Sequence, residues 1–318
     1  MGLIAALASA VLASAKDLVS KRLAFRLDGT ASTFASFAYA LPFYALILTV
    51  MYLMGEETFA LSGAFLLLVL LRSITDTLAE WLKMSAFTHG DISLVVSFFS
   101  LSPVIMLFTS PLITGDVPSF WGSAAVVIVT IGSLLLVYRP ISRSRIRENS
   151  ALEDDENRIL TPSTASRLVD STTASFAAQK KAILLAICAA LFFSLNSCFD
   201  RLAVQKAHPV LSGFAMTLLS ALFLLPLIVG NAARLAGLGS NWRGLWIRGF
   251  LEATFMVCKL TALQYWQAPY VAGFQRFSLV LSIIGGRVFF KEADFGRRLA
   301  AGILILGGIL LIACLEEN

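Results

Sequence analysis

The chain has 318 residues, of which 58% are hydrophobic and only 14% are charged, and its formal net charge is +5. Soluble domains carry about 25% charged residues, so this composition excludes an ordinary soluble fold. The apolar runs are continuous rather than alternating and are about 20 residues long, which predicts membrane-spanning helices and argues against a β-barrel.

We predict ten membrane spans, which in chain order cover residues 3–21, 31–54, 61–84, 92–113, 118–138, 181–201, 210–230, 243–264, 268–290 and 296–315. The first run ends in Ala13-Ser14-Ala15, a sequence typical of signal-peptidase sites. No basic region precedes this run, so we expect it to be retained as the first helix.

One polar segment, residues 139–180, separates the spans into two groups of five. Its basic, acidic and Ser/Thr-rich stretches predict a disordered linker. Because each group has an odd number of spans, the second group enters the membrane the other way up. The predicted fold is therefore an all-α polytopic membrane protein with two inverted five-helix repeats, residues 1–138 and 181–318.

Charged residues interrupt the third and eighth spans at matching positions. At a constant offset of 176 residues, the second set repeats the first: Arg72, Asp76 and Lys83, then Arg248, Glu252 and Lys259. Glu80 belongs to the same stripe, and Met256 stands at its counterpart. Positions with the spacing of each set of three fall within roughly 60° of one helix face.

Charges inside a bilayer cost about 2.5–3.5 kcal/mol each on insertion scales, so they normally face a bundle interior or a wet cavity. We therefore expect both stripes to line a substrate path. The alternative is structural pairing within the helix, Arg72 with Asp76 and Glu80 with Lys83. The two lysines could instead extend to the lipid headgroups.

Further similarities accompany this offset. Ser102 corresponds to Ser278, Asp116 to Glu292, Ala125 to Ala301 and Gly132 to Gly308, while an offset of 179 pairs Arg22-Leu23-Ala24 with Arg201-Leu202-Ala203. The repeat therefore extends beyond the charged stripes.

Three other polar residues are candidate substrate-binding residues. Asp17 either lines a cavity or belongs to an interfacial turn near the end of the first helix. Gln275 and Arg276 lie in the ninth span, where a guanidinium group suits a carboxylate or a phosphate. Hydrogen bonding between helices is the alternative for Arg276.

Catalytic and metal-binding patterns are missing from the sequence. The four cysteines lie within predicted spans without metal-ligand spacing, and they imply no disulfide framework. There is no Gly-x-Ser-x-Gly, no HExxH and no histidine-rich cluster. We therefore expect neither an intramembrane enzyme nor a metal or cofactor.

The basic residues gather on the membrane side that carries the linker, whereas the opposite side has only Arg201 and Lys206. The positive-inside rule then places the linker in the cytoplasm and both termini outside. Because membrane topology accounts for the basic charge, we expect no nucleic-acid partner.

Two stretches resemble the fourth and ninth helices of the drug/metabolite transporter superfamily, and within it the EamA-like ten-helix transporters: Gly90-Asp91-Ile92-Ser93-Leu94-Val95 followed by Leu101-Ser102-Pro103, and Arg276-Phe277-Ser278 through Gly285-Gly286 to Phe290-Lys291-Glu292. The acidic residue that commonly follows the family's fourth helix is matched only loosely, by Gly115-Asp116. Family members generally have cytoplasmic termini, against the charge bias, so the orientation stays open.

These observations predict a secondary transporter, an exporter or exchanger of a small polar metabolite such as an amino acid or a related zwitterion or anion. It would work by alternating access between the inverted repeats. A lipid-headgroup flippase or a cation pathway on the same scaffold is the alternative.

The expected partners are a small-molecule substrate and the lipid bilayer, with a coupling proton, a counter-substrate and a homodimer as further candidates. The expected location is the cytoplasmic (plasma) membrane, as a multi-pass protein.

Overall fold

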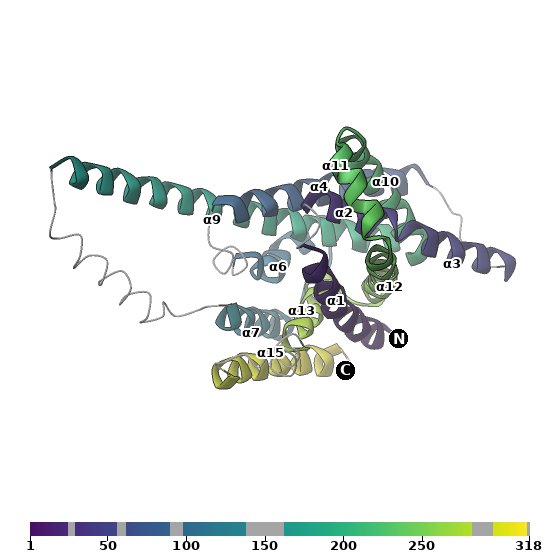
Figure 1. Cartoon of the computed structure of the whole chain (residues 1–318). Helices are drawn as coiled ribbons and strands as arrows, with labels where there is room; N and C mark the ends of the chain where they lie inside the picture. Colours follow the sequence, from purple (N-terminus) through teal and green to yellow (C-terminus); the bar gives the residue numbers. More distant parts are fainter. Residues whose placement is uncertain (25–28, 56–61, 90–97, 138–161, 282–294, 317–318) are drawn as a thin grey trace.

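The computed structural model describes residues 1–24, 29–55, 62–89, 98–137, 162–281 and 295–316. Helices make up nearly all of this part, which contains no β-strand (Figure 1). Both chain ends lie away from the N-terminal end of the longest helix, α9 (Figure 1).

The helices follow the predicted spans closely. Those before the central polar segment are α1 (Gly2–Ala24), α2 (Gly29–Ala38), α3 (Leu41–Leu53), α4 (Gly63–His89), α6 (Ser102–Ile113) and α7 (Phe120–Val137). Those after it are α9 (Pro162–Val204), α10 (Pro209–Val229), α11 (Ala232–Ser240), α12 (Trp242–Tyr265), α13 (Ala268–Gln275) and α15 (Phe295–Glu316). Each predicted span overlaps at least one of these helices, and residues 92–97 of the fourth span and 282–290 of the ninth lie outside the described residues.

Proline explains two departures from the predicted boundaries. The second span is divided into α2 and α3 just before Pro42, which has no N–H to donate to the carbonyl of Ala38. Helix α9 begins at Pro162, inside the segment expected to be disordered, and proline suits the first position of a helix. The remainder of that segment, residues 138–161, lies outside the described residues.

The short helix α11 is an element that the sequence analysis did not predict. It follows Asn231, whose side-chain oxygen accepts a hydrogen bond from the backbone N–H of Arg234 at 3.3 Å. This is the usual N-terminal capping arrangement. Helix α11 joins α10 to α12 outside the predicted spans.

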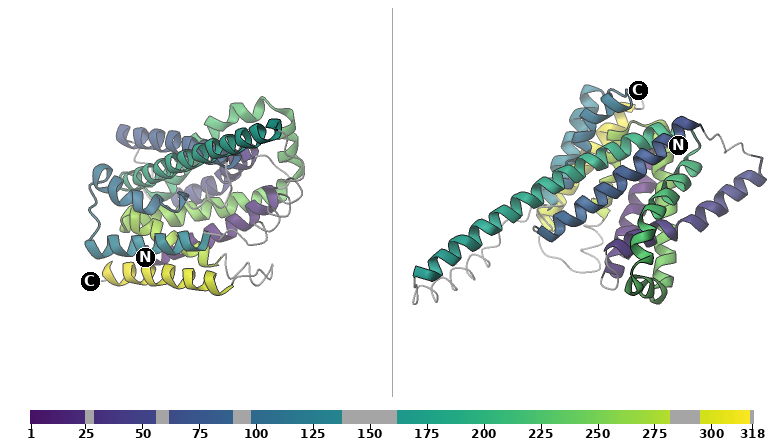
Figure 2. Two further views of the ribbon diagram at one scale, coloured as in Figure 1. Left: turned by 90° about the vertical axis from the view of Figure 1, so that its left-hand side faces the viewer. Right: turned by 90° about the horizontal axis from the view of Figure 1, so that it is seen from above.

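Three helix pairs dominate the packing. Helix α4 lies along α9, α1 lies along α12, and α7 lies along α15. Each of these pairs joins a helix from before the central segment to one from after it, and Figure 2 shows them from two further directions. The chain therefore folds as one interleaved bundle rather than as two separate groups of helices.

Two glycines allow α7 and α15 to approach closely, and their contacts are reciprocal. A Cβ added to Gly132 of α7 would lie 2.8 Å from Cγ1 of Ile305 and 3.0 Å from the carbonyl oxygen of Ala301. A Cβ added to Gly308 of α15 would lie 2.5 Å from Cγ2 of Val129 and 2.9 Å from the carbonyl oxygen of Ala125. The offset of 176 relates every residue of one contact to a residue of the other.

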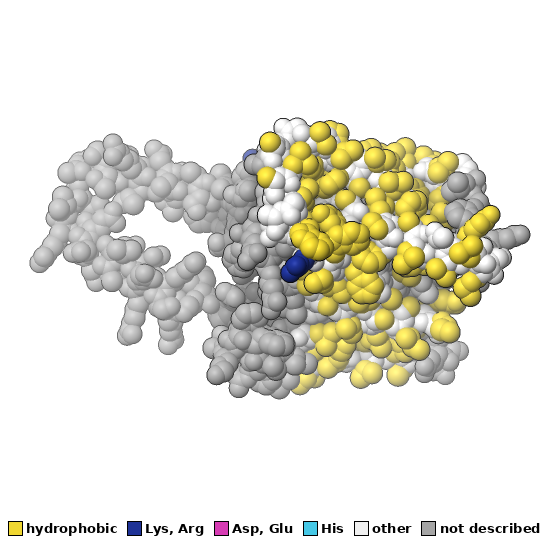
Figure 3. Space-filling model, turned by 45° about the vertical axis from the view of Figure 1, so that its right-hand side comes forward, with side chains coloured by type: hydrophobic (Ala, Val, Ile, Leu, Met, Phe, Trp, Pro, Cys, Tyr) yellow, Lys and Arg dark blue, Asp and Glu magenta, His cyan; other side chains and the backbone are white. Residues whose placement is uncertain are grey.

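Hydrophobic side chains cover much of the described surface, and Figure 3 shows them spread over one face. Among the described residues, three helical segments are long and apolar enough to cross a membrane: Thr30–Leu53, Lys180–Val204 and Pro209–Val229. Exposed aromatic residues lie near helix ends, as at a membrane–water interface: Tyr52, Trp121, Trp242 and Tyr265. This surface suits a lipid environment.

Candidate functional site

Four buried charged side chains from α4, α9 and α12 form a central ion cluster, which consists of Arg72, Asp76, Asp200 and Lys259. Asp200 has no exposed surface and accepts from Nε of Arg72 at 3.1 Å and from Nζ of Lys259 at 2.7 Å. Nη1 of Arg72 also lies 3.2 Å from Oδ2 of Asp76. The two cations and two carboxylates balance, so the cluster is formally neutral.

Polar side chains complete the surroundings of this cluster. Nδ2 of Asn196, on α9, donates to Oδ1 of Asp76 at 2.8 Å. The hydroxyl of Ser220, on α10, lies 3.5 Å from Nη1 of Arg72. Because the contacts from α4 to α9 cross from the first half of the chain to the second, the cluster joins the two halves.

A second ion pair joins the halves between α1 and α12. Nζ of Lys16 lies 3.2 Å from Oε2 of Glu252 and 4.2 Å from the centre of the Phe255 ring. Glu252 corresponds in the repeat to Asp76. Each of these two acidic residues therefore contacts a polar side chain on a helix of the other half, Asn196 on α9 for Asp76 and Lys16 on α1 for Glu252.

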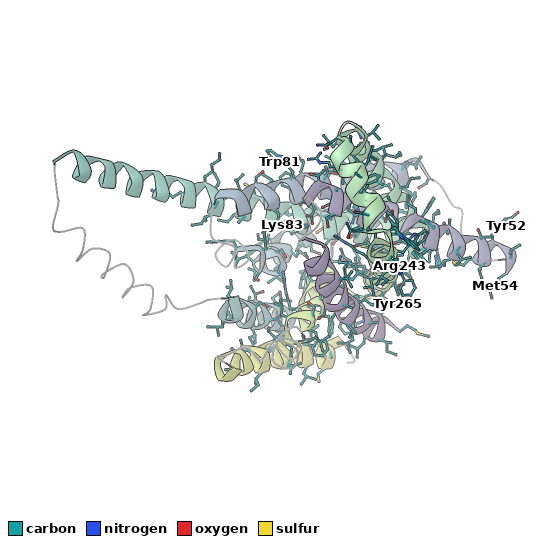
Figure 4. The ribbon with its side chains drawn as sticks, in the orientation of Figure 1. Tyr52, Met54, Trp81, Lys83, Arg243 and Tyr265 are labelled. Carbon is teal, nitrogen blue, oxygen red and sulfur yellow. The ribbon has the colours of Figure 1, made fainter. Side chains whose placement is uncertain are left out.

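The remaining charges of the two stripes lie apart from the central ion cluster. Lys83 pairs with Glu80 within α4, and its Nζ is 5.4 Å from the centre of the Phe193 ring. Figure 4 shows Lys83 and the exposed Trp81 projecting from opposite sides of α4. Arg248 donates to the hydroxyl of Ser32 on α2.

Arg276 lies where two interrupted helices meet. In the first half the helix is interrupted at Ser100–Leu101, immediately before α6. In the second half a turn at Arg276 follows α13, and the offset of 176 pairs this residue with Ser100. Interrupted helices at corresponding positions of two repeats are typical of transporter binding sites.

The proline that interrupts the helix before α6 also explains one contact of Arg276. Pro103 has no N–H to donate to the carbonyl of Phe99 four residues earlier. Nη2 of Arg276 donates to this carbonyl instead, at 3.3 Å, and to the hydroxyl of Ser102 at 3.0 Å. Both acceptors are uncharged.

At the turn that follows α13, two hydrogen-bond donors are unused. Within the described part of the chain, Nε of Arg276 and Nε2 of the adjacent Gln275 are buried and have no hydrogen-bond partner. Buried donors normally have one. A ligand with an anionic or carbonyl oxygen could therefore bind here without displacing a protein carboxylate.

Sequence reasoning placed the charged stripes inside the bundle but missed several of their partners. Arg72, Asp76, Glu252 and Lys259 are buried as expected. Asp200 and Lys16 were not among the candidate residues, because neither has a counterpart in the repeat that would draw attention to it. The side chain of Asp17 lies outside the described residues, although its backbone belongs to α1.

Metal-binding and thiol clusters do not contribute to the site in the described part of the chain. No group of three or more His, Cys, Asp and Glu side chains there could hold a metal ion. The cysteines at positions 188, 198, 258 and 314 form no disulfide within the described part of the chain. The chemistry of this region is therefore that of ion pairs and hydrogen bonds.

Apolar helices, a hydrophobic surface and buried charges at the interface between two halves define an integral membrane protein with a polar interior. Comparison with known families identifies its class further. The sequence matches the EamA-like transporter family over residues 1–138 and 180–314, so the chain belongs to that family, within the drug/metabolite transporter superfamily. Its members are transporters and not enzymes.

The solved structures support the fold. One of 29 matching chains, titled "Crystal structure of protein", is 13% identical to this chain and has a TM-score of 0.69. The match covers 99% of this chain and 98% of that chain. No curated protein matches the sequence. The family therefore supplies the general activity, drug/metabolite-type transport.

Proposed function

We propose that the protein is a secondary transporter of a small polar metabolite, and that Arg276 binds an anionic group of the substrate. The single observation that carries this proposal is the buried Nε of Arg276, which lacks a partner among the described residues while Nη2 contacts only uncharged acceptors. A guanidinium group with free donor capacity matches a carboxylate or phosphate.

The packing supports transport by alternating access between two inverted five-helix repeats with ten spans. Exchanging the halves turns the pair of α4 with α9 into the pair of α12 with α1, and both pairs are observed. The reciprocal glycine contacts of α7 and α15 agree with the same exchange. Substrate sites in such folds lie at the interface between the repeats, near the bilayer midplane.

The central ion cluster has a different role in this proposal. All four of its charges are paired, so it offers an incoming substrate no uncompensated charge. We infer that Arg72, Asp76 and Lys259 hold the two halves in register, and that Arg276 with Gln275 provides the binding donors. Location in the plasma membrane, a coupling proton or counter-substrate, and a homodimer stay predictions of the sequence.

Ligand-induced stabilisation of the purified protein tests the substrate-binding proposal. A ligand at 100 times its dissociation constant stabilises the folded state by about 2.7 kcal/mol. We expect some organic anions of a metabolite library to raise the unfolding midpoint of the wild-type protein. Arg276→Gln should abolish this shift, and Arg276→Lys should weaken it because a point charge replaces a planar fork.

The matched control is Arg243→Gln, which removes an exposed arginine that stacks on Trp242 at the start of α12 (Figure 4). This variant should keep the anion-induced shift. If Arg276→Gln retains the same ligand response as Arg243→Gln, Arg276 is not the anion site.

A further inference from the structure

One end of the bundle is held closed by contacts between the two halves. The α6–α7 connection and the start of α1 lie there from the first half. The end of α9 and the α12–α13 connection lie there from the second half. At this end a Cβ on Gly2 would lie 2.6 Å from the Trp266 ring. The backbone of α1 therefore lies close against the Trp266 side chain here.

Arg201, near the end of α9, makes the charged contact at this end. Its Nε lies 3.0 Å from Oδ2 of Asp116, which belongs to the α6–α7 connection. Its Nη1 donates to the carbonyl of Leu263 in the last turn of α12. Carbonyls in the last turn of a helix lack an intrahelical partner and carry the negative end of the helix dipole, which favours a cation.

Tyr270 makes a second contact between the same segments. This buried side chain of α13 accepts a hydrogen bond at Oη from the backbone N–H of Ser119 at 2.9 Å. Gly122, in the first turn of α7, has no room for a Cβ beside the same hydroxyl. The Arg201–Asp116 ion pair and the hydrogen bond to Tyr270 together hold the α6–α7 connection against α9 and α13.

We propose that Arg201, Asp116 and the Leu263 carbonyl form a latch that closes this end of the transport pathway and opens during each transport cycle. The proposal rests on the proposed function, because it assumes that substrate passes between the two halves. The Arg201 and Asp116 side chains keep 12% and 20% of their surface exposed. Water can therefore replace the contact when it breaks.

The central ion cluster is unsuited to this task. Its carboxylates and Arg72 are almost completely buried, so separating them would leave charges without partners. The latch instead joins a connection between helices to a helix end, where movement disturbs few packed side chains. A gate that opens in every transport cycle requires a contact that is weak, accessible to water and reversible.

Cys198 is a native reporter of this latch. It lies three residues before Arg201 on α9, is fully buried, and its Sγ lies 3.7 Å from the hydroxyl of Thr109 on α6. When the α6–α7 connection leaves α9, this thiol should become accessible. Replacing Cys188, Cys258 and Cys314 with alanine leaves Cys198 as the single cysteine among the 318 residues of this chain.

The test measures the rate at which a hydrophilic maleimide modifies Cys198 in the purified protein in lipid nanodiscs. Asp116→Asn should raise the rate by up to about fivefold, the factor that corresponds to losing an ion pair worth about 1 kcal/mol. Asp116→Glu, which keeps the charge, should leave the rate near that of the parent. The matched control is Glu80→Gln, which breaks the partly exposed pair with Lys83 within α4.

An unchanged rate in Asp116→Asn would overturn the latch. An equal rise in Glu80→Gln would also overturn it, because general loosening of the bundle would then explain the exposure. The labelling needs no substrate, so its result is independent of whether Arg276 binds an anion.

Discussion

The central ion cluster and the site around Arg276 are both polar regions inside an apolar bundle, but they are built in opposite ways. In the cluster every cation contacts a carboxylate, and Asp200 alone contacts two cations. Around Arg276 the described contacts are a carbonyl and a hydroxyl.

This difference leads us to expect that the central ion cluster stabilises the fold and that the site around Arg276 binds ligand. A buried ion pair is costly to disrupt because each partner would be left as an isolated charge. A buried cation that contacts only neutral groups keeps the capacity to bind an anion. We therefore expect substitutions in the cluster to lower stability, and substitutions at Arg276 to lower ligand binding with little change in stability.

The largest effect should come from Asp200→Ala, which leaves Arg72 with one carboxylate partner and Lys259 with none in the cluster. We expect a loss of about 3–5 kcal/mol in unfolding free energy, measured by thermal or denaturant unfolding in detergent. Asp116→Ala removes a partly exposed carboxylate and is the control, with a loss of about 1 kcal/mol or less. Equal losses in the two variants would contradict the central role of Asp200.

An intermediate effect should appear in the pair of Arg72 and Asp76. Arg72→Gln leaves the buried Asp76 without its cation, and Asp76→Asn leaves Arg72 with one carboxylate partner instead of two. The double variant should therefore be more stable than the sum of the single losses predicts, by roughly 0.5–3 kcal/mol. A double-mutant cycle measures this coupling, and strict additivity would contradict it. Transport by the folded double variant would then show whether the pair also contacts substrate.

A smaller effect on stability should follow from Arg276→Met. The substitution removes a buried charge and keeps most of the side-chain volume, while the Phe99 carbonyl loses a donor. These effects oppose each other, so we expect a change within about 1 kcal/mol in either direction. A loss comparable to that of Asp200→Ala would mean that Arg276 is structural.

The smallest effect should come from Lys83→Met. Lys83 and Glu80 keep about a quarter of their side-chain surface exposed. Ion pairs of this kind contribute about 0–1 kcal/mol, and salt screens them. We expect an unfolding midpoint close to that of the wild-type protein. A large loss would place Lys83 in a role that its contacts do not indicate.

The sequence predicts where most helices lie because long apolar runs act locally, but it did not predict the interruptions within the second and fourth spans. Pro42 and Pro103 account for the interruptions before α3 and α6 from the missing backbone donor alone. The repeat offset also identified Gly132 and Gly308 as equivalent residues, and the structure brings their helices together. A match to the EamA-like transporter family confirms the resemblance.

The partners of the charged stripes were harder to predict. Arg72 and Asp76 are four residues apart, so their pairing follows from helix geometry. The contact of Arg72 with Asp200 joins residues 128 positions apart, and no local spacing encodes it. Which side of the membrane the termini face stays a prediction.

The contact between α7 and α15 allows one substitution to be tested at two equivalent positions. Because Gly132 and Gly308 contact equivalent residues, the same substitution can be made twice in one molecule in nearly identical surroundings. Gly132→Ala and Gly308→Ala should suffer the same steric conflict. Any difference between the stabilities of the two variants would then measure how differently the two halves tolerate the same substitution.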